Sequence, residues 1–138
     1  MRQNRTAERR PCAVLVNDDA EVERLLASSL APELEFHAVS TIQQARALLD
    51  DLRCVDLAFL DLELPEGNAD ELLERLARWP DAIRVLLANA LLEREATPGW
   101  ALGRGLRHRH LVHLVLCKPP ALEALRALKS MVLDLPGV

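Results

Sequence analysis

The chain has 138 residues and a mass of 15.4 kDa, which is the size of one domain. Half of the residues are hydrophobic and 28% are charged, which excludes a disordered chain, and no apolar run approaches the roughly 20 residues of a membrane span. The first eleven residues hold four arginines and no apolar stretch, so they are neither a secretory signal nor an anchor. We expect a cytoplasmic protein with a basic, disordered tail over residues 1–11 and one domain over residues 12–135.

The charge distribution argues against nucleic acid as a partner of this domain. The formal net charge is −4, and because the tail holds four arginines against Glu8, the rest of the chain carries −7. The three cysteines are widely spaced and flanked by apolar residues, which predicts reduced core thiols. Only two lysines stand against fifteen arginines, so the position of Lys118 merits attention.

Short apolar runs alternate with stretches of helical spacing along the whole chain. Each apolar run ends in polar residues, as a buried strand does, and the helical stretches end near proline. The expected strands are residues 13–16, 34–39, 55–60, 83–88 and 112–117. The expected helices are residues 20–30, 42–52, 72–77 and 122–132, and the second of them is capped by Ser40 or Thr41.

The stretch before the last strand has a mixed pattern. Residues 91–96 have the composition to begin a helix, but Pro98 and three glycines follow within nine residues. Proline and glycine are unfavourable inside helices, so we predict an irregular connection rather than one unbroken helix over residues 90–109.

Five repeats of strand and helix with continuous apolar strands predict an α/β protein, in which helices cover both faces of a parallel sheet. Ligands of such folds bind beyond the carboxyl ends of the strands. The residues that end strands in this sequence are Asn17, Asp18, Asp19, Asp61, Asn89 and Lys118.

Two of these strand ends carry a candidate pair of carboxylates, Asp18 and Asp61. Carboxylates that share a site repel each other unless a cation lies between them, and oxygen ligands favour Mg²⁺ or Ca²⁺. Lys118 adds a point charge that can meet an anion. A nucleophile, a metal and a cation suit phosphoryl transfer to a carboxylate, although either acid alone could equally be a helix cap.

Residues 12–133 resemble the receiver domain of two-component response regulators. The motifs that carry the resemblance are VLVNDDAEV at 14–22, VDLAFLDLELP at 55–65 and CKP at 117–119. The resemblance implies a flavodoxin-like (βα)5 doubly wound sheet with strand order 2-1-3-4-5. It also implies that Asp61 is the phosphoacceptor, that Asp18, Asp61 and the backbone carbonyl of Glu63 bind Mg²⁺, and that Lys118 pairs with the phosphoryl group.

The partners implied by the resemblance are a sensor histidine kinase or a phosphotransfer protein, and a downstream protein or a covalently linked output domain. It implies neither nucleic acid nor membrane as a partner of this domain, and it leaves open a homodimer. Such a module is not an enzyme beyond assisting its own phosphorylation and dephosphorylation.

Three positions depart from the family pattern. The register set by Val22 places Asn17 where the first of two acids is usual, which leaves Asn17 a weak or water-mediated contact to the metal. A slip of one residue would instead make Asp18 and Asp19 the pair. Asn89 replaces the usual Thr or Ser that binds a phosphoryl oxygen, and Val115 replaces the usual aromatic residue.

These departures favour, as an alternative, a degenerate receiver that acts through phosphorylation-independent protein contacts. A phosphoaspartate hydrolase of the haloacid dehalogenase kind is disfavoured, because Glu63 stands where that class normally has a second Asp. The histidines at 108, 110 and 113 lie among arginines, which predicts a solvated basic loop rather than a metal site.

Overall fold

The computed structural model describes residues 10–63, 69–89 and 107–134. Five strands form one sheet in the order β2-β1-β3-β4-β5, and every neighbouring pair is parallel. The strands are β1 (Cys12–Val16), β2 (Glu35–Val39), β3 (Leu57–Asp61), β4 (Ile83–Asn89) and β5 (Leu114–Lys118). The predicted strand order is therefore confirmed, and the topology is that of a flavodoxin-like doubly wound sheet.

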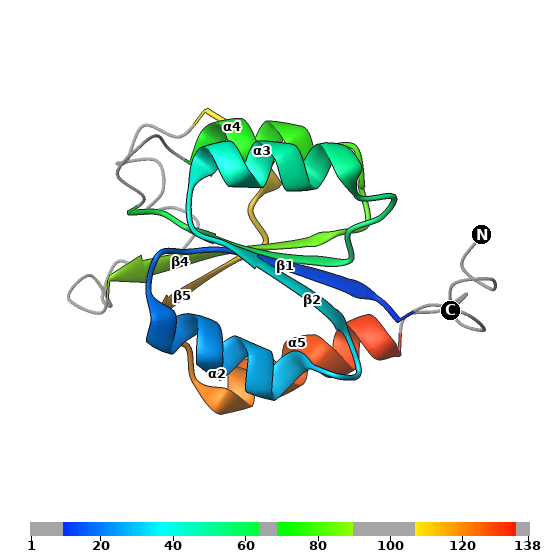
Figure 1. Cartoon of the computed structure of the whole chain (residues 1–138), viewed down its shortest axis with the longest axis vertical. Coiled ribbons are helices and arrows are strands. Elements are labelled where there is room, and N and C mark those ends of the chain that lie inside the picture. The colour runs from blue at the N-terminus through cyan, green and yellow to red at the C-terminus, as the bar shows by residue number, and fades with distance from the viewer. Residues whose placement is uncertain (1–9, 64–68, 90–106, 135–138) are drawn as a thin grey trace.

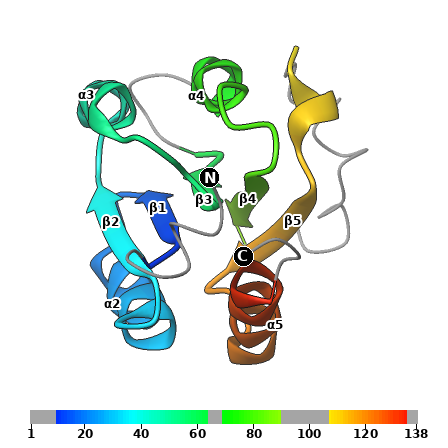
Figure 2. The same cartoon turned by 90° about the vertical axis from the view of Figure 1, so that its right-hand side faces the viewer.

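Helices cover both faces of the sheet, as Figures 1 and 2 show. The helices α2 (Ala20–Leu30) and α5 (Leu122–Leu133) lie side by side on one face. The helices α3 (Ile42–Asp51) and α4 (Ala69–Leu76) lie on the other. This arrangement follows from the parallel strands, because each crossover must return over a face of the sheet.

The element boundaries differ from those expected by a few residues at most. The third and fifth strands begin two residues later than predicted, and α4 begins three residues earlier. Residues 91–96, which have the composition to begin a helix, lie outside the described residues, as do positions 1–9 of the expected tail. In the described part of the long connection, a turn at 107–108 leads into the short 3-10 helix η3 (Arg109–Leu111), which agrees with an irregular connection there.

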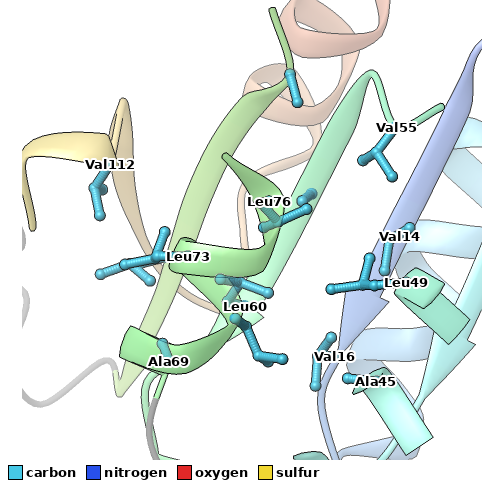
Figure 3. Packing of buried hydrophobic residues seen from close by; sticks show 14 of the residues in the cluster. Val14, Val16, Ala45, Leu49, Val55, Leu60, Ala69, Leu73, Leu76 and Val112 are labelled. Carbon is cyan, nitrogen blue, oxygen red and sulfur yellow. The ribbon is translucent and has the colours of Figure 1, made fainter. Parts of the chain in front are cut away.

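The core has two halves, one on each face of the sheet. Alternate residues of a strand point to opposite faces, so Val14 and Val16 pack toward α3 while Ala13 and Leu15 pack toward α2. Figure 3 shows the first half, in which Leu73 of α4 and its neighbours meet the strands. Both faces of β1 and β3 are buried, which explains why these strands read as unbroken apolar runs.

A buried carboxylate at the amino-terminal end of the sheet ties β1 to the start of β3. Asp56 is 5% exposed, and its Oδ2 accepts a hydrogen bond of 2.8 Å from the backbone N–H of Cys12. The backbone N–H of Asp56 donates in turn to the Cys12 carbonyl at 2.9 Å. These contacts fix the register between the strands that end in the candidate site.

A second buried polar residue at that end of the sheet, Arg84 of β4, joins two loops. Its guanidinium donates to the backbone carbonyls of Leu111 and Trp79, and its backbone N–H donates to His113 Nδ1 at 3.0 Å. Partial burial and the Arg84 charge lower the pKa of the His113 imidazole. His113 is exposed, as predicted for the basic loop, and its Nδ1 in addition has a fixed partner in the Arg84 N–H.

The three cysteines all lie in the described residues, and no disulfide joins them. No helix in the described ranges is long and apolar enough to cross a bilayer.

Candidate functional site

The carboxyl ends of the strands bring the predicted site residues to one edge of the sheet. Asp61 ends β3, Asn89 ends β4 and Lys118 ends β5, while Asn17 directly follows β1. Asn89 and Lys118 are register partners in neighbouring strands. Residues as far apart in the sequence as Asn17 and Lys118 therefore share one edge, because parallel strands end together.

The carboxylate of Asp61 lies at the centre of this edge and is only 1% exposed. Lys118 Nζ lies 3.1 Å from its Oδ1 and 3.0 Å from its Oδ2. The backbone N–H of Glu63 donates to Oδ1 at 2.9 Å, and Asn17 Nδ2 donates to Oδ2 at 3.1 Å. A carboxylate has about four lone-pair positions, so donors from the described residues engage all of them.

Asn17 is held on both ends of its amide. The side chain is buried, with 3% of the residue exposed, and its Oδ1 accepts a hydrogen bond of 2.6 Å from the backbone N–H of Asp19. An N–H can donate only to the oxygen, so this contact fixes which way the amide points. The Nδ2 group is consequently directed at Asp61.

The two acids that follow Asn17 have different surroundings. Asp18, which directly follows Asn17, is exposed. Asp19 is the N-cap of α2, where its Oδ1 accepts hydrogen bonds from the backbone N–H groups of Glu21 and Val22. Asp19 thus acts as a cap, a role that satisfies two of the unpaired donors at the start of that helix.

Val115 is buried and packs in the half of the core that contains Val112. The structure describes the backbone of Asn89 at the end of β4 but not its side chain, so its expected contact with a phosphoryl oxygen stays a prediction.

Asp18, Asp61 and the Glu63 carbonyl supply the oxygen chemistry that Mg²⁺ prefers. The Asp61 carboxylate, however, is already occupied by Asn17, Lys118 and the Glu63 N–H. These residues fit a magnesium ion provided that one donor gives up its contact with Asp61. Within the described parts of the chain, no cluster of three or more His, Cys, Asp or Glu side chains has the arrangement of a metal site.

Sequence reasoning missed two buried polar residues, Asp56 and Arg84. Each stands inside an otherwise apolar run, and a charged residue in such a run is a signal that a specific partner exists in the fold. It also did not foresee that the Asn17 amide donates directly to Asp61, while the weak or water-mediated contact of Asn17 with a metal stays a prediction.

In the described part of the basic loop before β5, Arg107 and His108 contact α4. The backbone N–H of His108 donates to Asp70 Oδ1 at 2.7 Å, and Arg107 Nε lies 3.6 Å from Asp70 Oδ2. Burial acts to raise the pKa of Asp70, but the hydrogen bonds and charge of His108 outweigh it and hold that pKa below the usual value. The contact anchors the described end of the long connection.

Comparison with solved structures identifies the fold. The signal receiver domain of an HD-domain-containing protein from Pseudomonas fluorescens Pf-5 superposes with a TM-score of 0.69 at 24% identity, covering 91% of this chain and 96% of that one. The receiver domain of Ssk1 from Saccharomyces cerevisiae, crystallised with the histidine phosphotransfer protein Ypd1, gives 0.63 at 21% identity over 84% and 83% of the two chains. A structure of adenylate cyclase from Rhodopirellula baltica gives 0.62 at 19% identity over 89% and 92%.

No protein-family model matches the sequence, and no curated protein does. The chain nevertheless has the fold of response regulator receiver domains, as the motifs at its strand ends predicted. At these identities the likeness concerns the fold, while the function must be argued from the site.

Proposed function

We propose that this chain is a phosphorylation-controlled signalling module that accepts a phosphoryl group on Asp61 from a histidine kinase or a phosphotransfer protein. The observation that carries the proposal is the contact of Lys118 with both oxygens of a carboxylate buried at the end of β3. A buried carboxylate beside a lysine, with little water around it, is suited to act as a nucleophile. The phosphorylated aspartate that forms is also an anion, so the lysine can pair with it as well. The complex of the Ssk1 receiver with Ypd1 supports a phosphotransfer partner.

The transfer is a displacement at phosphorus. One oxygen of Asp61 attacks, a phosphorus–oxygen bond forms, and the bond from phosphorus to the donor's imidazole nitrogen breaks. The donor histidine keeps the electron pair of that bond and takes up a proton. Lys118 remains beside the transferred group and offsets its charge.

The attacking oxygen must first lose one of its hydrogen bonds, since all four lone-pair positions of Asp61 are engaged. Asp18, Asp61 and the Glu63 carbonyl would hold Mg²⁺ in this proposal, and the ion would supply positive charge next to the transferring group. Lys118, Asn17 and the Glu63 N–H hold the carboxylate in position before the transfer.

The same occupied carboxylate favours a second candidate function. A receiver whose acceptor is fully hydrogen-bonded within the chain could keep the fold and signal through protein contacts without being phosphorylated. In both candidates the output is a contact with a downstream protein or a linked output domain, and neither nucleic acid nor a reaction of the domain's own on another molecule is involved. Both place the domain in the cytoplasm.

A small phosphodonor distinguishes the two candidates. The protein is incubated with acetyl phosphate or phosphoramidate, with and without Mg²⁺, and its intact mass is measured. We expect the mass of one phosphoryl group to be added in the presence of Mg²⁺, and we expect Asp61→Asn to abolish the gain. Asp51→Asn is the matched control, because Asp51 is exposed at the end of α3. An unchanged mass in folded protein with both donors would establish the degenerate candidate instead.

A further inference from the structure

We infer that Asn17 is a positioning residue that competes with a divalent cation for Asp61 and thereby sets the metal dependence of the site. The inference rests on the proposed function, because it concerns the same carboxylate. It goes further than that proposal because the Asn17 amide itself acts on Asp61. The alternative is that Asn17 matters only because it lacks the negative charge of an acid.

The first step of the argument is the fixed direction of the amide. The Asp19 N–H donates to Asn17 Oδ1 at 2.6 Å, so Nδ2 cannot exchange places with the oxygen without losing that bond. Because Asn17 is buried, water does not offer an equal replacement for either contact. The chain therefore keeps an N–H donor directed at Asp61 Oδ2 at 3.1 Å.

The second step is the occupancy of Asp61. Its Oδ2 accepts from Asn17 and Lys118, and its Oδ1 accepts from Lys118 and the Glu63 N–H. A cation that coordinates either oxygen must displace one of these donors. Asn17 directly precedes Asp18, the exposed acid expected to bind the cation, so Asn17 is the donor that we expect the cation to displace from Oδ2.

The third step separates this competition from the loss of a charge. If Asn17 merely lacks the negative charge of an acid, then Asn17→Ala leaves the affinity for Mg²⁺ unchanged, because alanine is also uncharged. If the amide competes, then removing it frees Oδ2 and tightens Mg²⁺ binding. The alanine variant therefore gives opposite results under the two interpretations.

The test is a titration of the full chain with MgCl2, followed through the backbone amide signals of Glu63 and Asp19 in ¹⁵N NMR spectra. The free energy contributed by one hydrogen bond to a charged group corresponds to about a tenfold change in affinity. We therefore expect Asn17→Ala to bind Mg²⁺ about tenfold more tightly than the unmodified chain. Asn17→Ser is the second variant: its hydroxyl can still accept from the Asp19 N–H but is too short to reach Asp61. It should tighten binding similarly.

Asp56→Asn is the control for general loosening, because Asp56 is a buried polar residue at the opposite end of the sheet. Its Mg²⁺ affinity should equal that of the unmodified chain. Unchanged or weaker Mg²⁺ binding in the folded alanine and serine variants would overturn the inference. The mass measurement with phosphodonors is separate: tighter Mg²⁺ binding without phosphorylation would leave this inference standing and remove the proposed function.

Discussion

Lys118 contacts Asp61 across an intervening strand, because β4 lies between β3 and β5 in the sheet. The two residues are 57 positions apart, yet Nζ lies within 3.1 Å of both carboxylate oxygens. Their exposures differ: the side chain of Asp61 is 1% exposed and that of Lys118 is 18% exposed. The pair is therefore asymmetric, since only the lysine has access to water.

This asymmetry predicts unequal costs for the two substitutions. Lys118→Met leaves the buried carboxylate of Asp61 without its cation and should lower the free energy of unfolding by about 3 kcal/mol. Asp61→Asn removes the buried charge and leaves a lysine that water can reach, so its cost should stay below about 1 kcal/mol. Urea unfolding at pH 7 measures both values. Equal losses for the two variants would contradict the asymmetry.

Replacing Asn17 by an acid should make the site depend on divalent cations. In Asn17→Asp an oxygen replaces the Nδ2 donor close to Asp61 Oδ2, and two neighbouring carboxylates repel unless a cation lies between them. We expect a lower melting temperature without Mg²⁺, recovery on adding it, and tighter Mg²⁺ binding than in the unmodified chain. The gain should be largest at low salt, because screening weakens the attraction. If the melting temperature of the variant does not change on adding Mg²⁺, this prediction is wrong.

Substitutions of Asp18 and of Asp19 should have different effects on the affinity for Mg²⁺. Asp18→Asn should weaken Mg²⁺ binding, because Asp18 is exposed, directly follows Asn17 and is the acid expected to bind the metal. Asp19→Asn should leave binding nearly unchanged, because Asp19 caps α2 and asparagine caps a helix about equally well. Isothermal titration with MgCl2 compares the two variants. If Asp19→Asn is the weaker binder, the alternative register with Asp18 and Asp19 as the acidic pair is correct.

The buried carboxylate of Asp56 should be a major source of stability. Asp56→Ala removes the acceptor of the Cys12 N–H and should cost about 2 kcal/mol, while Asp56→Asn keeps an acceptor oxygen and should cost less. Denaturant unfolding gives both values, with Asp51→Ala as the exposed control. A negligible cost of Asp56→Ala would show that the contact contributes little to holding β1 against β3.

His113 should make the fold less stable in mild acid. Its Nδ1 accepts the Arg84 N–H, and its pKa is lowered in the folded chain by burial and the Arg84 charge. The unfolded chain therefore binds a proton more readily, so stability is complete above the unfolded value of about 6.5 and falls as the pH drops from there toward the folded pKa.

The variant His113→Asn keeps an acceptor oxygen but does not titrate in this range. Its free energy of unfolding should change less between pH 7.5 and pH 5 than that of the unmodified chain, while His110→Asn, in the same basic loop but away from the Arg84 N–H, should leave the slope as it was. The same slope in all three proteins would contradict the role assigned to His113.

The sequence by itself determined the order of strands and helices, the residues that end each strand, and the class of fold. These features are local: apolar runs, helical spacing and polar strand ends can be read from neighbouring residues, and parallel strands must end at one edge. That is why Asp61 and Lys118 could be placed together before any coordinates were known.

The tertiary structure alone decided what these side chains contact. Asn17 follows β1, and the residues around it in the sequence do not indicate its partner. Only the fold brings its amide to Asp61, which is 44 positions away. The fold also brings the Asp19 N–H to the oxygen of that amide. Asp56 and Arg84 were missed for the same reason, since a buried polar side chain is stabilised by partners that are distant in sequence. Hydrogen bonds depend on directions and distances between elements, and the pattern of residues along the chain does not carry them.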